Sequence, residues 1–367
     1  MSNVLTLARQ MIAVDSRSSV SNLPVLELMQ SRLTAWDVER IDYVDDDGVP
    51  KANLVARHPG SISTLAFAGH LDTVSAAGWM TDPFAPTIDG GRLMGLGAAD
   101  MKGPVAAFMC AVERTDPTMR PLLVLTADEE TTKRGVREVV ARSRHLREKP
   151  PACFIVCEPT QLGVVRGHRV DVQFVVTARG VQAHSSTGKG LNANLALIPF
   201  LSDLRLLHLR LRQDTALHDP QYDPPFCDLN FVIDNHGTVP NTTVGLATCR
   251  IKFRYSKSFD PAPVVEEVRR IAMQNGLEII VRPEAPPPEL PADARQVIAL
   301  EKIVGGRARV MGLGTEASEY SRVAPSLIFG PGDLDDAHKP SESIELSQLS
   351  AAEEAYVRIA EQLPAAL

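Results

Sequence analysis

The sequence predicts an α/β protein of two domains. Residues 1–167 and 283–367 should form the larger domain, with a mainly parallel sheet flanked by helices, and residues 168–282 a smaller inserted α+β domain. Three observations support this prediction. A chain of 367 residues exceeds the size at which one hydrophobic core usually stops growing. Outside the insert, short apolar runs alternate with helical patterns, as in proteins with a parallel sheet. Inside the insert, the first predicted strand instead alternates apolar and polar residues.

Four apolar runs read as buried strands, because a sheet covered on both faces needs apolar side chains on both sides of each strand. They are residues 65–70, 121–127, 152–157 and 325–329. Histidine or carboxylate residues follow each run, at once or after a short loop. Because the carboxyl ends of parallel strands line one crevice, where ligands bind, we expect these residues to meet there.

The periodicity of apolar residues in the insert differs from that in the larger domain. Apolar and polar residues alternate over residues 170–177, and residues 228–234, 247–255 and 277–282 also read as strands. Residues 192–211 and 264–274 have helical patterns. The proline-rich residues 283–291 predict a stiff connector back to the larger domain.

Composition excludes several classes of protein. A net charge of −7, without a cluster of basic residues, argues against a nucleic-acid surface. No stretch of about 18 apolar residues occurs, so we expect no membrane span. The five cysteines are odd in number and scattered, which favours free thiols in a reducing cytoplasm over a disulfide framework.

Five side chains are candidate metal ligands. His70, Glu130, Glu158 and His338 lie at or after the ends of the four runs, and Asp100 lies just before the helical run of residues 104–113. Two imidazoles and three carboxylates form a nitrogen and oxygen set that suits Zn, Co or Mn. One carboxylate can bridge two ions, and such a pair activates water for attack on a carbonyl. Taken singly, each residue also has a simpler interpretation, such as a loop histidine, a helix-capping aspartate or a solvated acidic turn.

Two acidic neighbours could assist. Glu129, beside Glu130, could stay unligated and act as the general base. Asp72 lies two residues after His70, on the same side of an extended strand. Its carboxylate could accept a hydrogen bond from the imidazole nitrogen that is not bound to metal, or it could simply cap a turn.

Five motifs together resemble a known family. They are Gly69-His-Leu-Asp-Thr-Val74, Asp100-Met-Lys-Gly103, Asp128-Glu-Glu130, Cys157-Glu-Pro-Thr160 and Ala337-His-Lys-Pro-Ser-Glu342. In this order, and with an inserted domain, they are similar to the co-catalytic zinc amidohydrolases and exopeptidases. That family includes acetylornithine deacetylase, succinyl-diaminopimelate desuccinylase, aminoacylase and glutamate carboxypeptidase.

The resemblance implies roles for these residues. His70, Asp100 and Glu158 would bind one metal ion, and Asp100, Glu130 and His338 the other, with Asp100 bridging and Glu129 as the base. His184, in Gly180-Val-Gln-Ala-His184, would stabilise the oxyanion, often across a dimer, although alone it could be an ordinary surface histidine.

Other residues would contact substrate. Asn241 and Arg254 match lid positions that hold a substrate carboxylate, although Arg250 and Arg254 share a strand face and could instead form structural salt bridges. Residues 314–318 and 330–332 look closest to the acetylornithine deacetylase branch, which makes Thr315, Glu316 and Gly330 candidate contacts. Departures at residues 98–99, 192–194 and 253–255 leave the acyl-amino acid open.

We therefore expect a cytoplasmic metallohydrolase with two divalent ions, zinc first and Co or Mn as alternatives. Its substrate would be an N-acyl amino acid, with N-acetylornithine or N-acetylcitrulline in arginine biosynthesis as the first choice. An exopeptidase, a dipeptidase or a succinyl-diaminopimelate desuccinylase would use the same chemistry, and a catalytically silent metabolite-binding protein is the remaining alternative. The exposed edge strand of the insert, which would act as a lid, suggests a homodimer.

Overall fold

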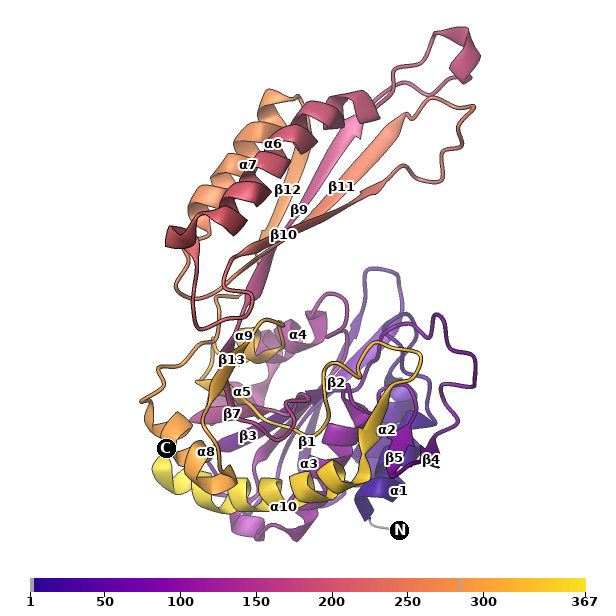
Figure 1. The fold of residues 1–367 in the computed structure, drawn as a ribbon. Coiled ribbons are helices and arrows are strands. Elements are labelled where there is room, and N and C mark those ends of the chain that lie inside the picture. Colours follow the sequence, from indigo (N-terminus) through magenta and orange to yellow (C-terminus); the bar gives the residue numbers. More distant parts are fainter. Residues whose placement is uncertain (1–2, 284) are drawn as a thin grey trace. The chain divides into compact units, whose positions relative to one another are not determined.

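The computed structural model describes residues 3–283 and 285–367, and the chain divides into two compact units (Figure 1). The first contains residues 1–167, 288–310 and 315–367, and the second contains residues 168–287 and 311–314. The second unit is therefore larger than the predicted insert. It gains residues 311–314, where the carbonyl of Met311 accepts a hydrogen bond from the N–H of Arg169 at 3.3 Å. Glu284, in the predicted connector, lies outside the described residues.

The first unit is built on an eight-stranded sheet, which confirms the predicted α/β class. Its strand order is β1-β2-β6-β3-β7-β14-β8-β13. The pairs β6–β3, β3–β7 and β7–β14 are parallel, whereas β1 and β2 add antiparallel strands at one edge. The strands are β1 (Asp37–Val44), β2 (Pro50–Arg57), β3 (Leu65–His70), β6 (Leu122–Thr126), β7 (Cys153–Val156), β8 (Val165–His168), β13 (Arg309–Met311) and β14 (Ser326–Ile328).

Helices cover both faces of this sheet (Figure 1). On one face, α3 packs against α1 and α10, and aromatic rings from the sheet and these helices meet at Phe67, Phe108 and Tyr356. On the other, α4 contacts β2 and α9, and α9 contacts β7. The helices are α1 (Asn3–Ile12), α2 (Leu23–Ser31), α3 (Lys102–Arg114), α4 (Arg134–Arg142), α5 (Arg144–Glu148), α8 (Arg295–Val304), α9 (Ala317–Tyr320) and α10 (Leu346–Gln362).

A small three-stranded sheet completes this unit. It consists of β4 (Thr87–Asp89), β5 (Arg92–Met94) and β15 (Ser343–Glu345), in the order β15-β5-β4. The pairing joins the segment before Asp100 to the segment after His338, which are far apart in the sequence.

Strand register places the site. His70 at the end of β3 pairs with Thr126, the last residue of β6, and Ala68 pairs with Val156, the last residue of β7. The acidic residues that follow β6 and β7 therefore begin at the same edge of the sheet as His70. All residues of these three strands are buried, which explains why the predicted strands read as continuous apolar runs.

The second unit contains a four-stranded antiparallel sheet with two helices on it (Figure 1). Its strands, in the order β10-β11-β9-β12, are β9 (Val170–Arg179), β10 (Asp228–Asp234), β11 (Leu246–Tyr255) and β12 (Glu278–Pro283), and its helices are α6 (Asn194–Gln213) and α7 (Ala262–Gln274). β9 alternates buried and half-buried residues, as predicted for a half-covered sheet. Within the described residues, no helix is both long enough and apolar enough to cross a membrane.

Candidate metal centre

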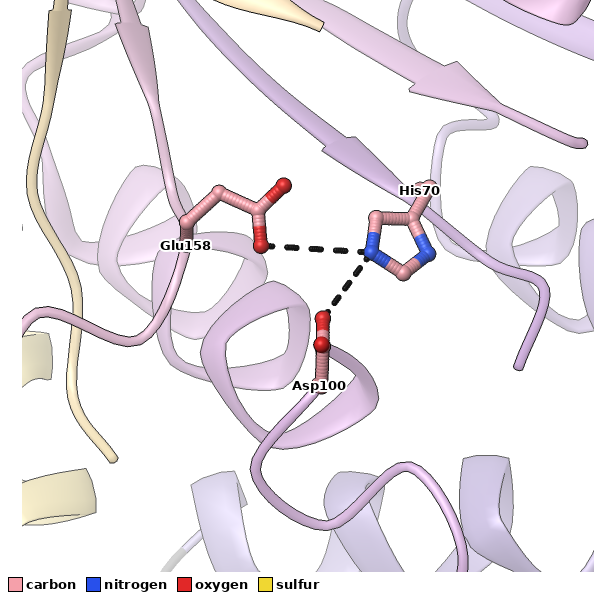
Figure 2. Close-up of side chains that lie close together, drawn as sticks. All are labelled: His70, Asp100 and Glu158. Atoms are coloured by element: carbon pink, nitrogen blue, oxygen red, sulfur yellow. Dashed lines mark hydrogen bonds and ion pairs between the residues drawn. The ribbon is translucent and has the colours of Figure 1, made fainter. Parts of the chain in front are cut away.

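His70 lies at the end of β3 with 1% of its surface exposed. Its Nε2 is 3.1 Å from Asp100 Oδ1 and 4.0 Å from Glu158 Oε2, so both carboxylates approach the same ring nitrogen (Figure 2). The other nitrogen, Nδ1, is 3.0 Å from the main-chain carbonyl of Asp72. A proton on Nδ1 satisfies that carbonyl and leaves the Nε2 lone pair directed at the carboxylates, the form in which imidazole binds a metal.

A second group forms on the other side of Asp100. The Nε2 of His338 is 3.3 Å from Asp100 Oδ2 and 3.0 Å from Glu130 Oε2. His338 is held in the left-handed region, with φ 59°, a conformation that costs energy for a residue with a side chain and is often found at functional sites. Asp100 thus presents one oxygen to each histidine.

These two groups have the geometry of candidate metal sites. In each, the ligand atoms lie within 4.8 Å of one another: His70, Asp100 and Glu158 in the first, and Asp100, Glu130 and His338 in the second. They contain the residues that the family resemblance implied, and they share Asp100.

Electrostatics show what this cluster needs. Burial, followed by the nearby charge of Asp100, raises the pKa of Glu130 to about 8 and that of Glu158 well above its usual range. Hydrogen bonds to Asp100 and Glu130 raise the pKa of His338 to about 11. The carboxylates therefore repel one another in a poorly solvated space and require positive charge between them. Two divalent cations with nitrogen and oxygen ligands fit this requirement.

Asp72 is fully buried beneath the site, and its carboxylate accepts hydrogen bonds that the sequence did not predict. Its Oδ2 accepts hydrogen bonds from the hydroxyl of Ser18 at 2.7 Å and the N–H of Glu130 at 3.3 Å, and its Oδ1 accepts one from the N–H of Glu129 at 3.3 Å. The distance from Oδ1 to His70 Nδ1 is 3.5 Å, longer than the contact to the Asp72 carbonyl. The carboxylate thus holds the backbone of the acidic pair, while the carbonyl is the nearer acceptor for the imidazole.

Glu129 is half-buried beside these ligands. Burial raises its pKa, Lys133 and His70 oppose that rise, and the charges of Asp100 and Asp72 add to it. The preceding residue, Asp128, accepts a hydrogen bond from the Tyr43 hydroxyl at 2.7 Å and lies 3.2 Å from the amine of Lys51. Contacts of Asp128 and of the N–H groups of Glu129 and Glu130 therefore hold the backbone from which the Glu129 carboxylate extends.

Three predicted substrate contacts, Thr315, Glu316 and Gly330, are buried in this structure. Glu316 is 0% exposed, and its Oε2 accepts hydrogen bonds from the hydroxyls of Thr126 at 2.8 Å and Tyr320 at 3.3 Å. Thr315 is buried, and its Oγ1 accepts the N–H of Ala317 at 3.0 Å, near the start of α9. Both side chains thus have hydrogen-bond partners inside the protein, and their direct contact with a substrate stays a prediction.

Gly330, the third, is a packing position. A Cβ atom there would lie 2.5 Å from the carbonyl oxygen of Glu158 and 2.6 Å from that of Cys157. The absence of a side chain lets the segment after β14 approach the backbone of a candidate ligand closely, which is a structural reason for glycine.

The remaining predicted residues belong to the second unit. The N–H of Ser185 donates to the carbonyl of Asn241 at 2.9 Å, and His184 pairs with Thr242 as an isolated bridge, so these two motifs lie side by side. His184 is exposed, and its Nδ1 accepts the N–H of Ser186 at 3.3 Å.

Arg250 and Arg254 differ in their contacts. Arg250 lies 3.4 Å from Asp234, which is the salt bridge that the sequence left open, whereas within the described residues Arg254 forms no ion pair. Arg254 is half-buried on β11. Of these two arginines, Arg254 is therefore the one whose guanidinium remains available to a carboxylate from outside the protein.

The fold and the site define a class, an α/β protein with candidate ligands for a pair of divalent ions. The family model for "Peptidase family M20/M25/M40" matches residues 66–362, and the chain belongs to this family. It is therefore a metallohydrolase that acts on amide bonds.

Individual proteins agree with this assignment. An acetylornithine deacetylase of Pectobacterium carotovorum is 32% identical over 350 residues, covering 91% of this chain and 89% of that protein. The di-peptidase Dug1p of Saccharomyces cerevisiae has a TM-score of 0.78 at 13% identity, covering 99% of this chain and 96% of that one. YXEP of Bacillus subtilis, a dinuclear metal-binding peptidase, has a TM-score of 0.65 at 13% identity, with 99% and 98% covered. The two structural likenesses show the fold.

Proposed function

We propose that this enzyme hydrolyses the amide bond of an N-acyl amino acid, with N-acetylornithine as the first candidate substrate and N-acetylcitrulline as the second. The observation that carries the proposal is the pair of ligand groups that share Asp100, with Glu129 beside them. The relative of Pectobacterium carotovorum, an acetylornithine deacetylase, supports the choice of substrate. The reaction would then serve arginine biosynthesis.

In this proposal, His70, Asp100 and Glu158 hold one divalent ion and Asp100, Glu130 and His338 the other. Zinc is the first choice and Co or Mn the alternatives, because two imidazoles with carboxylates suit these metals. When bound, such a pair of ions acidifies a water molecule and polarises the scissile carbonyl.

Glu129 acts as the general base and then as the acid. It takes a proton from the attacking water and delivers it to the leaving amine. Burial, which raises its pKa, favours this double role, because an ordinary carboxylate is too weak a base near neutral pH. Asp72 serves this step by holding the N–H groups of Glu129 and Glu130.

The second unit supplies groups for the substrate. In this proposal Nδ1 of His184 accepts hydrogen bonds from the hydroxyl of Ser186 at 2.7 Å and from its N–H at 3.3 Å, so that Nε2 donates to the oxyanion of the tetrahedral intermediate. Arg254 offers a planar guanidinium for the substrate carboxylate, and Asn241 an amide. Replacing Arg254 with Ala should raise KM more than it lowers kcat.

We also propose a homodimer formed through the second unit. β10 is an edge strand of the four-stranded sheet, with Val232 55% exposed, and the neighbouring helix α6 has Ile198 61% exposed. An apolar groove lined by residues that include Ile198, Leu201 and Phe231 runs between them. Exposed apolar surface beside an unpaired strand edge is what two copies would bury together.

Two experiments test the dimer. Sedimentation should give a dimer for the wild type and a monomer for Ile198→Asp, with Met273→Asp, exposed on α7, as the control. Mixing a His184→Ala protein with a Glu129→Gln protein should restore activity if His184 acts in the partner's site. A wild-type monomer would contradict the dimer, and no recovery would contradict the shared site.

A cytoplasmic location belongs to the same proposal. All five cysteines are buried free thiols, which suits a reducing compartment.

A substrate panel tests the function. Zinc- or cobalt-loaded protein should be assayed on acetylornithine, acetylcitrulline, succinyl-diaminopimelate and a dipeptide. The proposal expects the largest kcat/KM on an acetylated amino acid. Preference for the dipeptide or the succinylated substrate would identify an exopeptidase or a desuccinylase, and full metal loading without turnover on the panel would identify a binding protein.

A further inference from the structure

We infer that Glu342 is a positioning residue that sets the place of Asp100, the carboxylate shared by the two ligand groups. The inference rests on the proposed function only for the assignment of Asp100 as a ligand. Glu342 lies four residues after His338 and is 1% exposed. Its role would be to determine how tightly both ions are held, without touching either.

The contacts of its carboxylate support this role. Oε1 accepts hydrogen bonds from the N–H of Ala99 at 2.9 Å and of Asp100 at 3.0 Å, and Oε2 accepts the N–H of Gly97 at 3.0 Å. All three donors belong to the turn that leads into α3. Three main-chain N–H groups converging on one carboxylate form a fixed anion cradle, so the turn has one favourable conformation while Glu342 is present.

The turn needs such support because it has little regular structure of its own. Gly97 has φ 83°, and the N–H of Lys102 reaches back to its carbonyl at 2.8 Å. A Cβ atom on Gly97 would lie 2.8 Å from Thr73. The turn is thus closely packed behind the site, and a change in its backbone would move the Asp100 carboxylate relative to both histidines.

Glu342 also connects the two chain segments that carry Asp100 and His338. Its own carbonyl accepts the N–H of Gly95 at 3.1 Å, and its N–H donates to the carbonyl of Lys339 at 3.0 Å. The segment that carries His338 is therefore tied to the backbone of Asp100 through one residue. Together with the β15–β5 pairing, this connection holds the two segments that carry Asp100 and His338 at a fixed separation, although His338 itself lies in an exposed loop.

The variant Glu342→Gln tests the inference. The amide keeps one acceptor oxygen but places N–H groups against at least one main-chain N–H of the turn. Ion affinity is measured by competition with a chromophoric chelator, using Zn²⁺ alone. We expect both dissociation constants to rise by about 10- to 100-fold, the usual effect of losing a partner that orients a ligand. Glu354→Gln, an exposed glutamate on α10 paired with Arg114, is the matched control and should bind Zn²⁺ like the wild type.

A second readout needs no metal. In the ion-free protein, the amides of Gly97, Ala99 and Asp100 should exchange hydrogen faster in Glu342→Gln than in the wild type, while amides of β3 and β7 keep their protection. Activity is a third readout, measured with metal: excess Zn²⁺ should restore the kcat of Glu342→Gln to the wild-type value, with KM unchanged. If Glu342→Gln does not fold, Glu342→Asp, which keeps the charge but shortens the reach, replaces it in these measurements.

Two outcomes would overturn the inference. Wild-type Zn²⁺ affinity and wild-type exchange in the turn would show that Glu342 does not position Asp100. Faster exchange throughout β3 and β7, with no rescue by Zn²⁺, would show a general structural role instead. Failure of the proposed function is distinguishable, because a protein that binds Zn²⁺ but hydrolyses no acyl-amino acid still reports on Glu342 by affinity and exchange.

Discussion

Replacing Asp72 with Asn should weaken the metal centre although the shape of the side chain is unchanged. The Asp72 carboxylate accepts hydrogen bonds from Ser18, Glu129 and Glu130. An amide has only one acceptor oxygen, so its NH₂ group must face at least one N–H or O–H of this set. The carbonyl of Asp72 still accepts the proton on His70 Nδ1, so the imidazole should keep its orientation.

The size of the effect follows from these contacts. A buried donor left without a partner costs about 1–3 kcal/mol. The backbone of Glu130 should shift to relieve this cost. Since 1.4 kcal/mol corresponds to a factor of ten, the shift should weaken ion binding by about 10- to 100-fold. This agrees with the usual effect of losing a ligand's supporting partner. The rate should fall as well, because the N–H of Glu129 is released with it.

Chelator competition with Zn²⁺ measures the affinity, and single-turnover assays of the fully loaded protein measure the rate. Asp89→Asn, on exposed strand β4, is the control and should match the wild type. Asp72→Asn with wild-type affinity and rate would refute the reasoning, because it would show that the N–H groups of the acidic pair do not depend on this carboxylate.

Three further predictions concern stability. Gly330→Ala should lower the free energy of unfolding by about 1–3 kcal/mol, because the new Cβ would meet the carbonyl of Glu158, whereas Gly60→Ala, where the space is open to ordinary contact, should change little in denaturant titrations. Burial raises the pKa of Glu39, but the hydrogen bonds to it, led by the N–H of Arg144, outweigh burial and hold the pKa below the ordinary 4.5. This stabilisation is present above pH 4.5 and is lost as the pH falls through the lower folded value, so Glu39→Gln should be less stable than the wild type at pH 7. A gap that does not narrow as the pH falls below 4.5 would contradict this. Zn²⁺ at 100 times its dissociation constant should add about 2.7 kcal/mol per site to the stability, and a chelator should remove it; an unchanged melting temperature would argue against binding to the folded state.

Much of the fold could be predicted from local patterns, and so could the gathering of candidate ligands at one edge of the sheet. The runs that became β3, β6 and β7 are buried on both faces, so their composition alone identified them. Parallel pairing then brings their carboxyl ends to one edge of the sheet, which is why His70 and Glu158 could be placed together before any coordinates.

What could not be predicted depends on contacts between distant residues. The hydroxyl of Ser18 reaches Asp72 across 54 positions, and no local pattern marks either end of that bond. The small sheet β15-β5-β4 could not be predicted, because strands of three residues are too short to show a periodic pattern. Glu316 was assigned to substrate from its motif, whereas its burial against Thr126 and Tyr320 is a property of tertiary packing.

The most direct test of the central claim is the rate of deacylation by Glu129→Gln, measured at full metal loading. The structure places Glu129 next to the two ligand groups without making it a member of either. We predict that the variant binds two equivalents of Zn²⁺ as the wild type does, while kcat on an acetylated amino acid falls by about 10²- to 10⁴-fold, the contribution of a general base. A variant that binds two ions and keeps the wild-type rate would contradict the account.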